Sequence, residues 1–220
     1  CIKRSGKDIL HLVEDFLEFE RAPDAMQRGQ SAVVDVADLL QNQVQMSRPL
    51  IGSKDLSIEL DYGRETPRHV LVNESLVRRV VQNLVSNAIK FTSKGKVTLQ
   101  AEGRTVGQNA HLMISVSDSG KGLDAAQQVK VFDRGFKEEA QEVGYGIGLS
   151  VCREIVESLG GKIGVESTPG LGSRFWFKLK VPVVEARVDA KAVESAPSSP
   201  DSPTSQALAF SANHGARAKV

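Results

Sequence analysis

The segment ESLVRRVVQNLVSNAIKF, residues 74–91, predicts one helix with two different faces. Its apolar side chains gather on one side at about 100° per residue, which predicts burial against a sheet. They are Val77, Val81, Leu84, Val85 and Ala88. Asn83, Asn87 and Lys90 fall together on roughly the opposite side, spaced by four and three residues. Because Asn73 is a typical N-cap residue, we expect the helix to begin directly after it.

The polar stripe of this helix suits the phosphate groups of a nucleotide and a magnesium ion. A carboxamide oxygen such as that of Asn87 is a neutral, hard ligand for Mg2+, which usually keeps several waters and contacts phosphate oxygens. Lys90, one turn further on, would neutralise phosphate charge. Asparagine is a poor residue inside a helix, so two in one stripe are informative. An ordinary solvent-exposed face remains the alternative for this segment taken alone.

A first glycine cluster, DSGKG at residues 118–122, follows the alternating run HLMISVS. Asp118 would accept a hydrogen bond from the exocyclic amine of a buried base. Gly120 and Gly122 would let the backbone pass close to that ligand, because they carry no Cβ. Taken alone, the motif is also compatible with a turn that Asp118 opens after a strand.

A second glycine cluster, GYGIGLS at residues 144–150, directly precedes a predicted helix. Free backbone amides and the helix dipole at such a place suit a phosphate group, with Gly144, Gly146 and Gly148 giving the close approach. No single strand leads into the cluster, and no Gly-Lys-Ser/Thr follows it. It is therefore neither a Rossmann fingerprint nor a P-loop.

The segment VFDRGFKEEAQEV between the two clusters predicts a mobile lid. Phe132 and Phe136 would anchor its base, and Arg134 or Lys137 would reach a phosphate. An ordinary surface loop is the alternative. STPGLGS, residues 167–173, predicts a hairpin turn.

The order of the predicted elements gives the fold class. Strands are predicted at 54–62, 69–73, 96–102, 111–118, 162–168 and 173–181, and helices at 35–47, 74–91, 125–132 and from 148 to the stop at Gly160 and Gly161; a polar loop is expected at 103–108. Strands that arrive in pairs between helices favour an α+β, two-layer sandwich, with a mixed sheet that helices cover on one face. A doubly wound fold would alternate strand and helix more regularly.

Composition excludes several classes of function. The 220 residues carry a net charge of +1, so no long-range field favours nucleic acid or a membrane surface. The two cysteines, Cys1 and Cys152, lie far apart, which suits a reducing, cytoplasmic compartment. The four histidines are scattered, so a zinc site is not expected. A chain that opens with cysteine is expected to be a fragment, and the full protein is free to carry a membrane anchor upstream.

In this order, the motifs resemble the catalytic, ATP-binding domain of sensor histidine kinases, within the wider Bergerat-fold family of gyrase, heat-shock chaperone and MutL ATPases. QNLVSNAIKFT resembles the asparagine box of that family, and DSGKG its first glycine box. FDRGF resembles the phenylalanine box, GYGIGL the second glycine box, and TPGLGSRF the closing Thr/Gly segment. The resemblance covers roughly residues 5–182.

The resemblance implies a role for each matching residue. Asn87 would coordinate Mg2+ with Asn83 beside it, and Lys90 would contact phosphate. Asp118 would bind the adenine amino group of ATP. The other residues implied at the nucleotide are Gly120, Gly122, Phe132, Arg134, Phe136, Gly144, Gly146, Gly148, Leu149 and Thr168.

The resemblance also implies which reaction this branch of the family performs. ATPases and serine kinases of the superfamily have a glutamate as general base one turn before the magnesium asparagine, where this chain has Asn83. A neutral histidine acceptor already carries a lone pair and needs no such base. Phosphoryl transfer to a histidine, then to an aspartate of a response-regulator receiver domain, is expected. A Bergerat-type ATPase and a non-catalytic nucleotide-binding module are the alternatives.

The predicted domain organisation has three parts. Residues 1–27 are expected to be the end of a dimerisation hairpin, residues 31–182 the catalytic domain, and residues 183–220 a disordered Ser/Pro/Ala-rich tail. The family's acceptor histidine is followed by an acidic residue, whereas His11 is followed by Leu12. We therefore expect the acceptor upstream of this chain, on a hairpin through which the full protein forms a homodimer.

Overall fold

The computed structural model describes residues 30–136 and 146–184, which lie within the first of two units of the chain, Cys1–Ala186. The predictions for residues 1–27, His11, Lys137, Gly144 and nearly all of the tail therefore lie outside the described residues. The described strands are β1 (Ala32–Asp35), β2 (Asp55–Tyr62), β3 (His69–Val72), β4 (Lys94–Val106), β5 (Asn109–Asp118), β6 (Lys162–Thr168) and β7 (Gly172–Pro182). The described helices are α2 (Val36–Ile51), α3 (Glu74–Phe91), α4 (Ala125–Lys130) and α5 (Gly148–Ser158).

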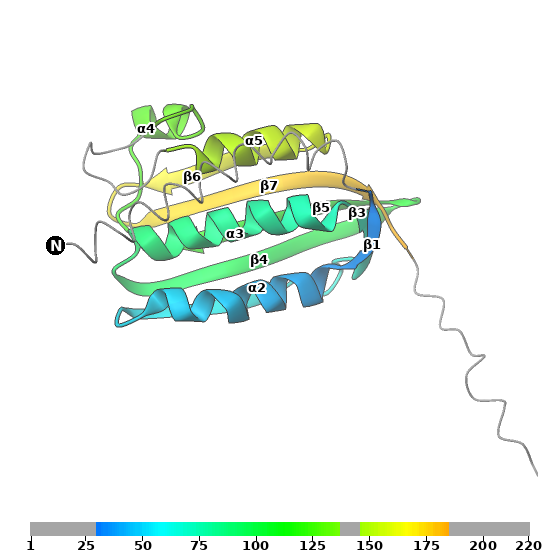
Figure 1. The fold of residues 1–220 in the computed structure, drawn as a ribbon, viewed down its shortest axis with the longest axis horizontal. Coiled ribbons are helices and arrows are strands. Elements are labelled where there is room, and N and C mark those ends of the chain that lie inside the picture. Colours follow the sequence, from blue (N-terminus) through cyan, green and yellow to red (C-terminus); the bar gives the residue numbers. More distant parts are fainter. Residues whose placement is uncertain (1–29, 137–145, 185–220) are drawn as a thin grey trace, which may run out of the picture. The chain divides into compact units, whose positions relative to one another are not determined.

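Five of these strands form a mixed sheet in the order β2–β4–β5–β7–β6. β2 and β4 run parallel, and each of the other neighbouring pairs is antiparallel. Helices α2, α3 and α5 lie side by side on one face of the sheet (Figure 1). The expected α+β, two-layer sandwich is confirmed.

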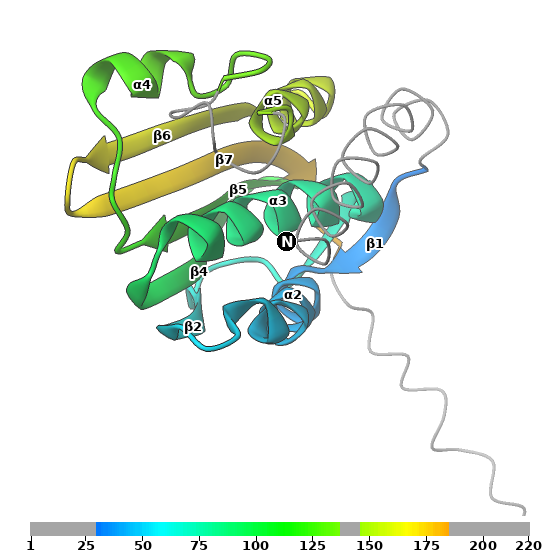
Figure 2. The same cartoon turned by 60° about the vertical axis from the view of Figure 1, so that its left-hand side comes forward.

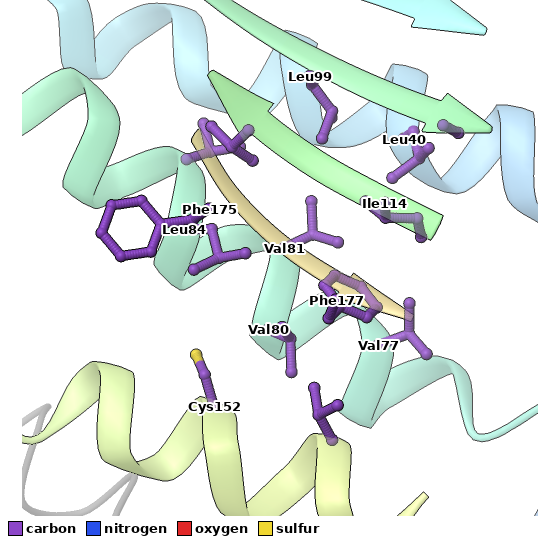
Figure 3. Close-up of a cluster of buried hydrophobic side chains, with 14 of the residues drawn as sticks. Leu40, Val77, Val80, Val81, Leu84, Leu99, Ile114, Cys152, Phe175 and Phe177 are labelled. Atoms are coloured by element: carbon purple, nitrogen blue, oxygen red, sulfur yellow. The ribbon is translucent and has the colours of Figure 1, made fainter. Parts of the chain in front are cut away.

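The core lies between these helices and the sheet. Every member of the predicted apolar stripe of α3 is buried, and so are the inward-facing side chains of β7. The buried residues of β7 include the four whose alternation predicted a shared face: Phe175, Phe177, Leu179 and Val181. Figure 3 shows Val81 of α3, Phe177 of β7 and Cys152 of α5 in one cluster of side chains. Burial of one stripe of α3 therefore fixes the rotation of the helix about its axis.

The structure differs from the sequence-based prediction in three places. β1 was not expected, and it pairs antiparallel with β3 in a separate two-stranded sheet. The loop expected at residues 103–108 is wrong, because β4 and β5 continue as a hairpin to a turn at Gly107, whose φ is +62°. Helix α2, predicted to end at Ser47, ends at Ile51 and has Pro49 in its last turn.

Each difference has its own physical reason. The strand β1 obtains its backbone hydrogen bonds from β3, far away in the sequence, which no local pattern reveals. The end of the β4–β5 hairpin is exposed and polar, so it lacks the apolar alternation that predicts a strand. Pro49 is tolerated because it lies on the exposed side at the end of its helix, where water can serve an unpaired carbonyl.

Candidate functional site

Three segments that are far apart in the sequence meet at one end of the sheet. They are the C-terminal end of α3, the turn 118–122 after β5, and the turn between β6 and β7. The amide of Gly170 donates to the carbonyl of Lys121 at 2.7 Å, and the amide of Leu123 donates to Ser167 Oγ at 2.7 Å. Figures 1 and 2 show these three segments together on the left side of the molecule.

Asp118 ends β5, where its backbone pairs with Val97 of β4 and Ser173 of β7. Its Oδ1 accepts a hydrogen bond of 2.8 Å from the amide of Gly120. Burial raises the pKa of Asp118 above its usual value, and the backbone amides of Gly120 and Ser173 and the Thr92 hydroxyl oppose that rise. The carboxylate is thus desolvated but held in one orientation, as recognition of a base by hydrogen bonding requires.

The Thr92 hydroxyl, at the end of α3, lies beside Asp118. Its Oγ1 is buried, and it faces the Asp118 carboxyl closely enough to lower the pKa of that group. A Cβ added to Gly120 would lie 3.0 Å from this oxygen and 2.8 Å from Asp118 Oδ1, so both oxygens border the same narrow space. The end of α3 and the end of β5 therefore contribute neighbouring polar groups to the site.

Two glycines allow the turns to approach so closely. Gly122 has a φ of +68°, and a Cβ there would lie 2.1 Å from the carbonyl oxygen of Thr168. Gly172 has a φ of +110°, and a Cβ there would lie 1.9 Å from the carbonyl oxygen of Asp118. Only glycine fits both the positive φ and the lack of space. Thr168, a predicted nucleotide residue, is brought to this contact through its backbone.

The polar stripe of α3 carries two carboxamides that contact each other. Asn87 Nδ2 donates to Asn83 Oδ1 at 3.1 Å, and both side chains are half-buried. This hydrogen bond leaves the oxygen of Asn87 as the acceptor that points away from Asn83. A neutral oxygen held in this way fits the preference of Mg2+, with phosphate oxygens and water as the remaining ligands.

The N-terminus of α5 lies against this stripe. A Cβ on Gly148, the first residue of α5, would lie 2.3 Å from Asn83 Nδ2. The N-cap residue Ile147 gives no side-chain cap to the first turn. The first turn of α5 and the positive end of the helix dipole lie beside the carboxamides of α3, an arrangement that suits phosphate. Gly146, with a φ of +68°, turns the chain into this helix.

The described part of the predicted lid is attached to the core at its base. Phe132 is buried and packs edge-on against Phe175, with ring centroids 6.2 Å apart. Phe136 is half-buried against the same core. Arg134, predicted to reach a phosphate, pairs in this structure with Glu154 of α5, with its Nε 3.1 Å from Oε1. Sequence reasoning did not foresee this ion pair, since the two residues are far apart along the chain.

Among residues 30–136 and 146–184, no group of three or more His, Cys, Asp or Glu side chains converges to form a metal site. In the same part of the chain, no helix has the length and apolar character to cross a membrane.

The fold and this site define a class of protein: a nucleotide-binding α+β domain with a polar helix stripe, a half-buried carboxylate at the end of a strand, and glycine turns that adjoin them. Over residues 72–183, the chain matches the family described as histidine kinase-, DNA gyrase B-, and HSP90-like ATPase. That match covers more than half of the chain, so the chain belongs to this family.

Several curated relatives are sensor proteins. The chain is 34% identical to the sensor protein GacS of Pseudomonas syringae pv. syringae, over 86% of this chain and 21% of the relative. It is also 34% identical to the adaptive-response sensory kinase SasA of Synechocystis sp., over 81% of this chain and 46% of the relative. The chain therefore spans less than half the length of these relatives.

Solved structures agree with the fold. Full-length ShkA in complex with AMPPNP superposes with a TM-score of 0.72 at 29% identity, over 83% of this chain and 38% of that one. The mycobacterial sensor histidine kinase MprB has a TM-score of 0.58 at 22% identity, over 70% of this chain and 99% of that one. The second likeness supports the fold alone.

The close approach at Gly122 gives a first testable prediction. Gly122→Ala combines an unfavourable positive φ with a clash against Thr168, whereas Gly170→Ala, at a φ of +79° with open space, has only the unfavourable φ. Gly170→Ala should lower the free energy of unfolding by about 1–2 kcal/mol. Gly122→Ala should lower it by about 1–3 kcal/mol more. Urea unfolding of the two variants measures the difference, and equal losses would contradict the packing described for Gly122.

The burial of Asp118 gives a second prediction, on pH. The folded pKa lies above the usual 3.8, so the folded state binds the proton more tightly than the unfolded state does. The free energy of unfolding of the wild type, relative to Asp118→Asn, should therefore fall as the pH rises above about 3.8 and level off above the folded pKa. Chemical unfolding of both proteins between about pH 3 and about pH 7 tests the direction of this change in the free energy of unfolding. Parallel profiles for the two proteins would contradict it.

Proposed function

We propose that this chain is the ATP-binding catalytic part of a sensor histidine kinase, which transfers the γ-phosphoryl group of Mg-ATP to a histidine upstream. The observation that carries the proposal is that α3 adjoins both glycine turns: its C-terminal end contacts the turn after Asp118, and its carboxamide Asn83 lies against the start of α5. Each of these groups suits a different part of one nucleotide. Membership of the family supports the same reading.

Adenine binding is assigned to the end of β5. Asp118, when ionised, accepts a hydrogen bond from the exocyclic amine of the base, and Thr92 completes the polar contacts there. Gly120 and Gly122 let the turn after Asp118 pack against the end of α3 and the carbonyl of Thr168. Because the carboxylate is already desolvated and oriented, the base does not have to order it on binding.

Phosphate and magnesium binding is assigned to α3 and α5. The oxygen of Asn87 would be the protein ligand of Mg2+, held by the hydrogen bond from its own amide to Asn83. The amides at the start of α5 and the ammonium of Lys90 would contact phosphate oxygens. When bound, Mg2+ neutralises phosphate charge and fixes the geometry of the β- and γ-oxygens.

The chemistry then depends on positioning rather than on proton abstraction. The bond between the γ-phosphorus and the bridging oxygen breaks, a bond from the histidine nitrogen to that phosphorus forms, and ADP leaves. Asn83 cannot accept a proton at neutral pH, so it does not activate water as a glutamate would. The observation favours transfer to histidine over the alternative of steady ATP hydrolysis.

Further proposals concern the full protein and follow from the relatives. Some of them are named as sensor kinases, which supports a receiver domain as the next acceptor and a homodimer formed through an upstream helical hairpin. We also propose that the kinase domain works in the cytoplasm, where ATP is available.

The proposed pocket predicts how variants bind nucleotide. Mg-ATP should bind the wild-type chain, and Asp118→Asn and Asn87→Ala should each weaken binding by more than about tenfold, because each loses a charge-assisted or metal-mediated contact. Isothermal titration calorimetry measures the dissociation constants. Asn87→Ala should also lose most of the dependence on Mg2+, whereas Asp118→Asn should keep it.

Asn42→Ala is the matched control for this experiment, because Asn42 is an exposed helical asparagine on α2. It should bind Mg-ATP as the wild type does. Wild-type affinity in a folded Asp118→Asn or Asn87→Ala variant would contradict the assigned pocket.

A further inference from the structure

The C-terminal end of α3 is capped by a lysine from another element. Lys54 Nζ donates to three backbone carbonyls, those of Ile89 at 2.5 Å, Lys90 at 3.2 Å and Thr92 at 3.0 Å. The last carbonyls of a helix have no partner within the helix. An ammonium group that bonds several of them also lies at the negative end of the helix dipole, where a positive charge is favourable.

The turn between α2 and β2 brings Lys54 to this position. α2 ends at Ile51, and Gly52 reverses the chain with a φ of +58°. The amide of Lys54 then donates to the carbonyl of Ile51 at 3.1 Å. This tight turn directs the half-buried side chain of Lys54 toward the neighbouring helix α3. A lysine ammonium group usually stays in solvent, so this position needs the contacts with α3.

The carbonyls that Lys54 binds belong to the segment that borders the nucleotide site. α3 ends without a glycine cap, because Thr92 is already extended at φ −108° and ψ 121°. A Cβ on Gly120 would lie 2.6 Å from the carbonyl oxygen of Phe91, so this carbonyl packs directly on the first glycine turn. The position of the turn 118–122 is therefore coupled to the position of the end of α3.

A second set of hydrogen bonds holds the same segment from the other side. The amide of Lys96 donates to Ser119 Oγ at 3.0 Å, and the amide of Ser119 donates to the carbonyl of Lys96 at 3.2 Å. Residues 89–96 are thus fixed between Lys54 and the turn at Ser119. Lys54 supplies a positive charge that bonds three carbonyls of this segment.

We propose that Lys54 is a positioning residue of the nucleotide site, which acts through the backbone of residues 89–92 and does not itself touch nucleotide. This inference rests on the function proposed above. Lys54 holds the last turn of α3, and with it Asn87, Lys90 and Thr92, at the spacing from Asp118 that one Mg-ATP molecule needs. The turn between α2 and β2 is then a second support of the site, outside the motifs that characterise it.

The test compares Lys54→Met, which keeps the stem and removes the donor, with Lys54→Arg, which keeps a multiple donor. Lys180→Met is the matched control, because Lys180 is an exposed lysine near the end of β7, far along that strand from the turn at Gly172. Two quantities are measured on the folded proteins, well below their unfolding temperatures. They are the dissociation constant of Mg-ADP and the hydrogen exchange of the backbone amides of residues 90–96 and 120.

Lys54→Met should bind Mg-ADP about threefold to tenfold more weakly than the wild type, the range expected for a charge at a helix end. Its amides in residues 90–96 and at Gly120 should exchange faster without nucleotide. Lys54→Arg should recover most of both properties, and Lys180→Met should match the wild type. Rescue by arginine separates positioning from a general loss of stability.

Unchanged affinity in folded Lys54→Met would overturn the role of Lys54 and leave the proposed function intact. Equal effects in Lys54→Met and Lys180→Met would also overturn it, since the effect would then be one of surface charge. If the wild-type chain itself does not bind Mg-ADP, the proposed function fails, and the role of Lys54 fails with it.

Discussion

The burial of one stripe of α3 against the sheet is the constraint on which the rest of this structure depends. Val77, Val81 and Leu84 have almost no exposed surface, so the helix cannot rotate without opening the core. The opposite stripe, with Asn83 and Asn87, is therefore held toward the start of α5 by packing that has nothing to do with nucleotide. One face of α3 thus belongs to the hydrophobic core, and the opposite face belongs to the candidate site.

The ends of neighbouring strands and turns form the rest of the candidate site. β5 delivers Asp118 to the edge where α3 ends, and the hairpin of β6 and β7 closes on the turn that follows, through contacts that only glycine permits at 122 and 172. Thr92 and Lys54 then connect the end of α3 to its surroundings. Many of the polar groups of the site are thus placed by backbone geometry, which explains why glycines are as prominent in the motifs as charged residues.

The sequence predicted the elements with a strong period and the motifs with a local signature. The stripe of α3, the alternation of β7 and the N-cap Asn73 were predicted correctly, because each is a property of neighbouring residues. β1, the length of the β4–β5 hairpin, the pair of Arg134 with Glu154 and the cap by Lys54 were missed. β1 and the contacts of Arg134 and Lys54 depend on partners about twenty or more residues away, which periodicity does not show. The end of the hairpin was missed because its exposed, polar residues carry no apolar alternation.

The most direct test of the central claim is phosphoryl transfer in trans. The chain and radiolabelled Mg-ATP are mixed with a separately produced helical hairpin domain that carries an acceptor histidine, and acid-labile, base-stable label on the hairpin is followed over time. We predict labelling of the hairpin with little release of free phosphate in its absence, since Asn83 is no general base. Steady phosphate release without any acceptor, and no label on the hairpin, would contradict the account and identify an ATPase instead.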